Sequence, residues 1–147
     1  MKRFVQISLI LSLLLAFNSF KADAQCKGFA RKICKEELGD YTHDGNYHAA
    51  ILVEGEEAEL YKTFYSDQDY RLAICGSENL PSIEFTVMDA NKNILYSNAG
   101  DDFSTTWDFT LESSQQLKIV IKVNTFEQLA DNPASGCVAI MFGFMAQ

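Results

Sequence analysis

The apolar stretch GCVAIMFGF, residues Gly136–Phe144, is the segment from which the rest of the fold can be inferred. Successive side chains of a β-strand point to opposite faces of the sheet. The bulky face of this stretch consists of Val138, Ile140, Phe142 and Phe144. The other, mostly small face consists of Cys137, Ala139, Met141 and Gly143. Neither face carries a charge, which predicts a central strand that is covered on both sides. We expect a core against the bulky face, and a second layer with a cysteine bridge against the small one.

Seven further segments follow the same period of two, with turn-forming Gly, Asn, Asp and Ser residues between them. The eight expected strands are Tyr47–Val53, Ala58–Tyr65, Tyr70–Cys75, Ser82–Met88, Ile94–Ser97, Thr106–Leu111, Gln116–Val123 and Cys137–Phe144. Eight short strands with such turns are typical of an antiparallel β-sandwich of the jelly-roll or Greek-key kind. The chain is therefore expected to be mainly β.

The N-terminus has the pattern of an export signal. Lys2 and Arg3 precede the apolar run Phe4–Phe17, which is too short to span a bilayer comfortably, and Ala22 and Ala24 fit a cleavage site. We expect residues 1–24 to be a signal peptide and residues 25–147 to form a single domain. Two alternatives stay open: an uncleaved membrane anchor, and a lipoprotein modified at Cys26. The mature chain contains no second run of transmembrane length.

The expected mature domain is acidic. It has nine basic and nineteen acidic residues, a net charge of −10, and from Glu36 onward the balance is five against nineteen, or −14. Such a surface repels nucleic acid and anionic lipid. We therefore expect a secreted protein, periplasmic or extracellular, without a nucleic-acid partner.

Residues 26–38 are predicted to form an amphipathic helix that ends at Gly39. Its apolar side consists of Cys26, Phe29, Ala30, Ile33, Cys34 and Leu38. Export implies an oxidising compartment, so Cys26, Cys34, Cys75 and Cys137 are expected to form two disulfides. In one continuous helix Cys26 and Cys34 are about 12 Å apart, too far for a disulfide. Either both cysteines attach the helix to the sheet, or Cys26 lies in a non-helical lead-in and pairs with Cys34.

Part of a calcium-binding pattern is present. The calcium candidates are Asp89, Asn91, Asn93, Asp101 and Asp102. The first three alternate as in a calcium loop, but Ile94 and Gly100 replace the glycine and glutamate that the loop requires at its sixth and twelfth positions. The pattern favours a plain hairpin turn at residues 89–93. No cofactor is expected, calcium being the one alternative.

Candidate catalytic residues do not form a recognisable motif. His43 and His48 lie near Asp44 and could serve as metal ligands or as an acid–base pair. We favour structural roles, with His43 in a turn and His48 pointing outward from a strand. Nineteen acidic residues allow many carboxylate pairs, so no one pair indicates a glycosidase. The expectation is that the protein is not an enzyme.

Tyr61 and Tyr65 are the candidate ligand contacts. Together with Thr63 they share one face of an expected strand, and exposed tyrosines suit a sugar or protein surface. We favour ordinary packing at the core and its rim for these rings, with a ligand surface as the alternative.

Two stretches, Tyr70–Val87 (YRLAICGSENLPSIEFTV) with its following turn, and Gln116–Val123 (QLKIVIKV), resemble bacterial pre-peptidase C-terminal-type and GOLD-like secreted β-sandwich domains. The resemblance covers about 60% of the mature chain, which departs from the family by its cysteine-bearing helix and by having no peptidase attached. It implies a non-catalytic accessory or binding module.

The functional hypothesis from sequence is a secreted, non-catalytic binding or interaction module for an unknown protein or carbohydrate. The alternatives are a small extracytoplasmic hydrolase that uses loop carboxylates, and a calcium-stabilised sandwich domain.

Overall fold

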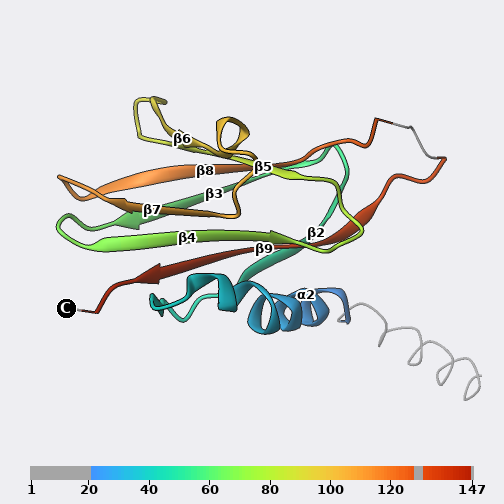
Figure 1. Ribbon diagram of the computed structural model, residues 1–147, viewed down its shortest axis with the longest axis horizontal. Coiled ribbons are helices and arrows are strands. Elements are labelled where there is room, and N and C mark those ends of the chain that lie inside the picture. The colour runs from blue at the N-terminus through green and yellow to red at the C-terminus, as the bar shows by residue number, and fades with distance from the viewer. Residues whose placement is uncertain (1–20, 128–130, 147) are drawn as a thin grey trace, which may run out of the picture.

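The computed structural model describes residues 21–127 and 131–146. Two antiparallel sheets pack face to face, and a helical layer lies on the outside of one of them (Figure 1). The predicted antiparallel β-sandwich is confirmed. The elements are α2 (Lys21–Lys32), η2 (Cys34–Leu38), β1 (Thr42–His43), β2 (His48–Val53), β3 (Glu57–Phe64), β4 (Asp69–Gly76), β5 (Ile83–Met88), β6 (Ile94–Ser97), η3 (Asn98–Gly100), β7 (Thr106–Thr110), β8 (Gln115–Val123) and β9 (Ser135–Phe144).

The chain passes repeatedly between the two sheets. The five-stranded sheet has the order β1-β9-β4-β7, with β2 also pairing with β9, and the four-stranded sheet has the order β3-β8-β5-β6. β9, the predicted central strand, is paired on both sides, since Ile140 lies opposite His48 of β2 and opposite Ile74 of β4. β9 therefore has no free edge, and its sequence is apolar throughout because both of its faces are also covered.

The two faces of β9 belong to different cores, as the alternation predicts. Val138, Ile140 and Phe142 lie in the core between the sheets. Ala139 and Met141 lie in a second, smaller core beneath the helical layer. The small residues of that face allow the helical layer to lie close to the strand.

The helical layer differs from the prediction of one helix over residues 26–38. The α-helix ends at Lys32, and Cys34–Leu38 is a 3₁₀ helix. Ile33, predicted on the buried side, is 55% exposed. In a 3₁₀ helix successive side chains turn by about 120° rather than about 100°, so the face of a continuous α-helix does not extend past the break. Cys34 and Leu38 are nevertheless fully buried.

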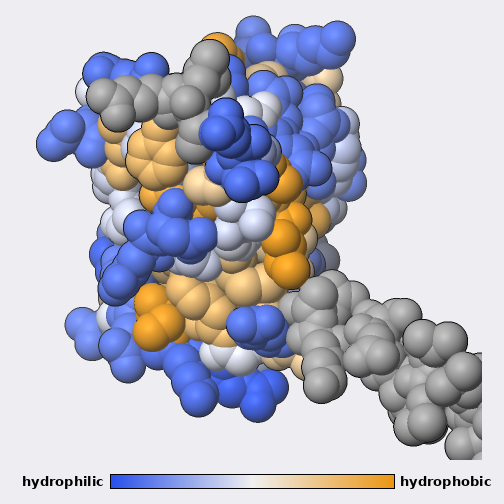
Figure 2. Space-filling view, turned by 90° about the vertical axis from the view of Figure 1, so that its right-hand side faces the viewer, coloured by the Kyte–Doolittle hydropathy of each residue, from blue (hydrophilic) through white to orange (hydrophobic). Residues whose placement is uncertain are grey.

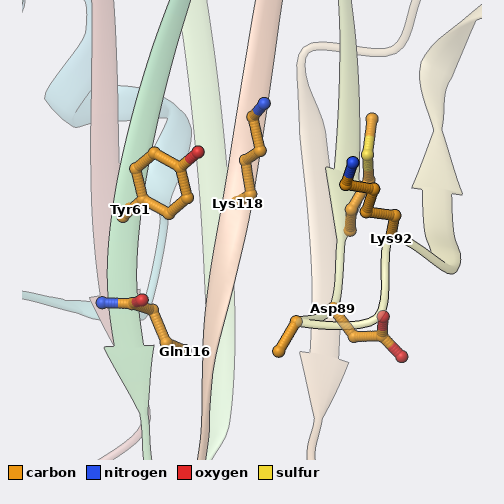
Figure 3. Close-up of a pocket in the computed structure, with 7 residues that line it drawn as sticks. Tyr61, Asp89, Lys92, Gln116 and Lys118 are labelled. Carbon is orange, nitrogen blue, oxygen red and sulfur yellow. The ribbon is translucent and has the colours of Figure 1, made fainter.

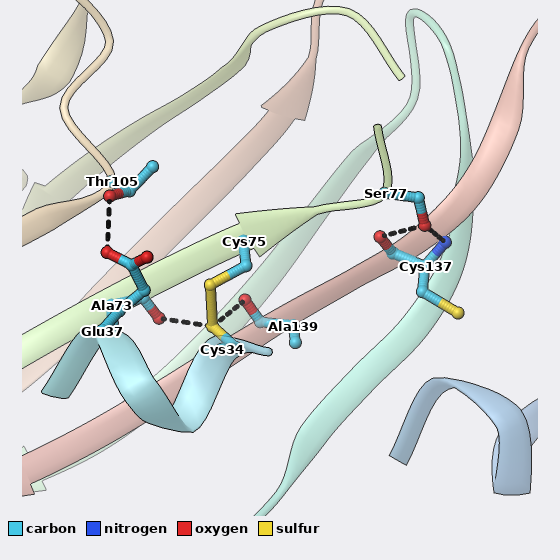
Figure 4. Close-up of a disulfide and its surroundings, with 8 residues drawn as sticks. All are labelled: Cys34, Glu37, Ala73, Cys75, Ser77, Thr105, Cys137 and Ala139. Atoms are coloured by element: carbon cyan, nitrogen blue, oxygen red, sulfur yellow. Dashed lines mark hydrogen bonds between the residues drawn. A yellow bond between two sulfur atoms is a disulfide. The ribbon is translucent and has the colours of Figure 1, made fainter. Parts of the chain in front are cut away.

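Both disulfides join the helical layer to the sheet. Cys26 is bonded to Cys137 at the start of β9, and Cys34 to Cys75 in β4. The local Cys26–Cys34 alternative is therefore wrong. The Cys34 sulfur also lies 3.9 Å from the carbonyl oxygen of Ala73 and 3.8 Å from that of Ala139 (Figure 4). A disulfide sulfur has no hydrogen to donate, so these are packing contacts.

The predicted strands agree with the structure to within a residue or two, but β1 was missed. The sequence predicts a turn at His43, whereas Thr42 and His43 pair with Phe144 and Gly143 at the end of β9. Two residues are too few to show a period in sequence. Residues 1–20 of the expected signal peptide lie outside the described residues, and the expected cleavage site after Ala24 falls within α2. Among the described residues, no helix is long and apolar enough to cross a membrane.

Candidate functional site

The outer face of the four-stranded sheet is open. The helical layer packs on β2, β4 and β9 of the other sheet. On β3, the outward-pointing residues Glu57, Glu59, Tyr61 and Thr63 are all exposed. The inward-pointing Phe64 is buried in the core. One sheet is thus covered by a disulfide-bonded layer, and the other presents side chains to solvent.

A hollow of about 280 Å³ lies on this open face (Figure 3). Its walls include Tyr61 of β3, Gln116 and Lys118 of β8, and Met88, Asp89 and Lys92 at the end of β5 and in the turn that follows it. The strand register brings these residues together, since Tyr61 and Met88 lie opposite Lys118 on its two sides. Tyr61 is 55% exposed. The hollow therefore combines an aromatic ring with amide and ammonium groups.

Lys118 is held in place within this site. Its Nζ lies 2.7 Å from Oε1 of Glu59 and 5.8 Å from the centre of the Tyr61 ring. The hydrogen bond to Glu59 raises the pKa of Lys118, because it favours the charged ammonium. Lys118 is thus a cation at neutral pH, and Glu59 fixes its position beside the tyrosine.

The turn at residues 89–93 forms one wall of the hollow and contains three of the calcium candidates. Asp89 accepts hydrogen bonds from the backbone N–H groups of Asn91 (2.8 Å) and Asn93 (2.9 Å), and from the Asn93 side-chain amide (2.8 Å). These bonds lower the pKa of Asp89, and the bond from the Asn93 side chain has the largest effect. The predicted hairpin turn is confirmed, and the Asp89 carboxylate is engaged by hydrogen bonds from its own turn.

Asp101 and Asp102 lie at the other end of the β5–β6 hairpin. The Tyr96 hydroxyl donates a 2.7 Å hydrogen bond to Asp101. Burial, together with this bond, raises the pKa of Tyr96 to about 12. The calcium candidates therefore do not converge, and the described residues contain no group of three or more His, Cys, Asp or Glu that could hold a metal ion. Calcium binding stays an untested alternative.

The histidine cluster is built around a structural ion pair. Asp44 Oδ2 lies 2.7 Å from Nζ of Lys62. Burial opposes ionisation of Asp44, but the hydrogen bonds from Lys62 and Asn46 outweigh it and lower its pKa. His43 Nε2 is 3.0 Å from the carbonyl oxygen of Asn46. His43 belongs to β1 rather than to a turn.

His48 does not point freely outward as expected. It is half-buried, with its ring edge-on to Phe142 at 5.8 Å between ring centres. Burial lowers the pKa of His48. It lines a groove of about 340 Å³ between the edge strands β2 and β3, where the apolar side chains Leu60 and Ile140 are reached from outside.

The two candidate tyrosines do not share a site. Tyr65 is 67% exposed, so neither it nor Tyr61 is packed in the core. Tyr65 lines a separate hollow with Lys62 and Phe142 at the side of the sandwich. Other exposed hydrophobic side chains belong to several different elements, and Figure 2 shows hydrophobic patches on one side of the molecule separated by hydrophilic residues.

Sequence reasoning found Tyr61 but missed the partners that make the hollow. Lys118 and Gln116 were placed correctly in a strand, yet their neighbours depend on which strands pair and in which register. That register does not follow from the alternation of a single strand.

Comparison with known proteins places the chain in no family. No family model matches it, and neither does any curated protein. A crystal structure of Aeromonas hydrophila PliG, a periplasmic lysozyme inhibitor of g-type lysozyme, is similar with a TM-score of 0.49 and 14% sequence identity, over 73% of this chain and 89% of that chain. The resemblance to pre-peptidase C-terminal-type and GOLD-like domains stays a prediction.

Proposed function

We propose that this protein is an exported, non-catalytic binding module that recognises a protein or glycan ligand on the open face of its four-stranded sheet. The observation that carries the proposal is the 55% exposed ring of Tyr61 beside a hollow of about 280 Å³. Tyrosine combines a large apolar ring with a polar hydroxyl, and such rings dominate many binding surfaces. The site stands on a sheet, so its side chains are held in a fixed arrangement.

The remaining geometry favours binding over hydrolysis. A hydrolase of the carboxylate-pair type requires two carboxyl groups facing the same substrate. The only acidic side chain among those that line the hollow is Asp89, and its oxygens accept three hydrogen bonds from its own turn. Asp44, the carboxylate of the histidine cluster, is engaged by Lys62.

The proposal is tested with the mature domain, residues 25–147, on a glycan array and in pull-downs from extracytoplasmic fractions. g-type lysozyme is included as a protein ligand. Each ligand found is then titrated against the wild type, Tyr61→Ala and Tyr65→Ala. Tyr65 is a matched control, because it is a similarly exposed tyrosine that lines a different hollow.

We expect Tyr61→Ala to weaken binding about tenfold or more, as loss of an interface tyrosine commonly does, and Tyr65→Ala to have little effect. Ligands that bind Tyr61→Ala as tightly as the wild type would place recognition elsewhere. Turnover of a glycan or peptide by the purified domain would exclude the non-catalytic proposal.

A further inference from the structure

The basic residues of this acidic protein are unevenly distributed. From Glu36 onward the five basic residues are Lys62, Arg71, Lys92, Lys118 and Lys122. Lys62 and Arg71 form ion pairs with Asp44 and Asp108, away from the open face. The other three lie on the open face of the four-stranded sheet or in the turn beside it, and Lys92 and Lys118 line the same hollow.

Lys92 stands where the backbone does not favour lysine. Its φ is +64°, in the left-handed region that glycine, and after it asparagine, adopts most readily. A side chain there costs about 1 kcal/mol. Lys92 forms no ion pair in the described part of the chain. The turn would thus be formed at least as well with glycine, and the lysine adds an unpaired positive charge at the rim of the hollow.

The two lysines flank the hollow from different elements. In Figure 3 Lys118 extends from β8 and Lys92 from the turn after β5. Both ammonium groups point toward the same end of the hollow, and Tyr61 lies beside Lys118. The Asp89 carboxylate points away from them. An anionic group entering here meets the unpaired Lys92 and the ammonium of Lys118, which Glu59 already holds in an ion pair, and next to them an aromatic ring and the Gln116 amide.

We infer that this hollow binds a sugar residue that carries a single anionic group, a carboxylate or a sulfate. The inference rests on the proposed function and names its ligand class. The sugar ring lies against Tyr61, the anion lies between Lys92 and Lys118, and Gln116 hydrogen-bonds a hydroxyl. About 280 Å³ is below the range typical of pockets for drug-sized molecules and suits one sugar ring.

Two features favour a sugar over an extended peptide or a membrane. The hollow lies over β8, which is hydrogen-bonded to β3 on one side and β5 on the other, so a peptide cannot add to a free strand edge there. The net charge of −14 from residue 36 onward repels anionic lipid surfaces.

The negative charge of the protein surface favours a ligand whose anionic groups are far apart. Glu57, Glu59 and Glu84 share the outer face with the lysines, as their register with Lys118 and Lys122 shows. A polyanion would meet these carboxylates beyond the hollow. The expected ligand is a mostly neutral glycan with separated acidic residues.

The test is a calorimetric titration of the mature domain with four probes. They are a disaccharide that contains glucuronic acid, the same disaccharide with the carboxylate reduced to an alcohol, its sulfated analogue, and an acidic peptide of equal charge. Wild type, Lys92→Gly, Tyr61→Ala and the control Lys122→Ala are compared. Lys122 lies on the same face of β8 but does not line the hollow.

We expect the carboxylated or the sulfated sugar to bind about tenfold or more tightly than the neutral one, because a charged hydrogen-bond pair is worth about one order of magnitude in affinity. Comparing the affinities of the two anionic sugars shows whether the hollow prefers a carboxylate or a sulfate. Lys92→Gly should lose most of this preference while its melting temperature is unchanged or higher, since glycine fits the left-handed position. Lys122→Ala should bind as the wild type does.

Failure of this inference is distinguishable from failure of the proposed function. The inference is overturned by any of three results: equal affinity for neutral and anionic sugars, an unaltered preference for anionic sugars in Lys92→Gly, or tighter binding of the acidic peptide. If a ligand is nevertheless bound in a way that depends on Tyr61, the proposed function as a binding module still stands. If Tyr61→Ala affects no ligand at all, both proposals are wrong.

Discussion

The side-chain oxygen of Asn98 accepts the backbone N–H of Phe85 at 2.8 Å. The Asn98 amide nitrogen in turn donates to the carbonyl oxygens of Ile83 (2.9 Å) and Ser104 (3.1 Å). Backbone pairing between β5 and β6 ends at Thr86 and Ser97. On the side of β5 that faces β6, the Asn98 side chain therefore replaces the backbone partners that the first part of β5 lacks. Asn98 is only 1% exposed.

Asn98→Ala is expected to lower the free energy of unfolding by about 2–3 kcal/mol, because it leaves a buried N–H and carbonyl groups without partners. Denaturant unfolding followed by circular dichroism measures this. Asn91→Ala is the control: the residue is exposed in a turn, so a change within about 0.5 kcal/mol is expected. Equal losses in the two variants would contradict the assigned role of Asn98.

Gly143→Ala should destabilise the fold by about 1–3 kcal/mol through overpacking. A Cβ at this position would lie 2.7 Å from Cβ of Tyr41 and 3.2 Å from a methyl carbon of Leu38. Gly28→Ala is the matched control, since an added Cβ there has no neighbour within 4 Å and alanine favours the α2 helix by about 0.5–1 kcal/mol. Thermal melts should therefore shift in opposite directions, and a Gly143→Ala melt equal to the wild type would show that the helical layer is not closely packed on β9.

Replacing Cys34 and Cys75 by alanine is expected to cost about 4 kcal/mol by the chain-entropy estimate for a separation of 41 residues. The variant without Cys26 and Cys137 should in addition expose α2, because that bridge joins the helix to β9. Hydrogen exchange is expected to show faster exchange in α2 with continued protection of β8. Uniform loss of protection in both elements would mean that the helical layer and the sandwich unfold as one unit.

Asp108→Asn should weaken the fold more at neutral pH than at acidic pH. The bidentate hydrogen bonds from Arg71, 2.6 and 2.7 Å, lower the pKa of Asp108. A carboxylate with a lowered folded-state pKa contributes stability that is fully present above the unfolded pKa of 3.8. This contribution is lost as the pH falls through the folded-state pKa. Since the Asp108 side chain is 46% exposed, the effect at pH 7 is at most about 1 kcal/mol.

Urea unfolding of wild type and Asp108→Asn at pH 7 and at about pH 3 checks this prediction. The difference between the two proteins should shrink at the lower pH. Asp131→Asn, an exposed carboxylate, is expected to change stability by less than about 0.5 kcal/mol. A difference that grows on acidification would show that Asp108 is not stabilised as a carboxylate.

Local patterns predicted most of the elements. The alternation of β9 correctly placed Ile140 against the core and Met141 on the opposite face, where a second layer was expected. The break at Ile33 was not predicted, since the apolar spacing continues across it, and helix type beyond that point depends on where Cys34 and Leu38 meet the sheet. The role of Asn98 was missed for a related reason: its partner Phe85 is identified only when β5 and β6 are paired.

Sequence alone determined that this protein is an antiparallel sandwich with an apolar central strand, because the period of a strand is set by its own residues. The tertiary structure decided which cysteines pair and which side chains surround Tyr61, since both depend on the order and register of strands that are distant in the chain. Register is a property of two strands together, so no single segment encodes it.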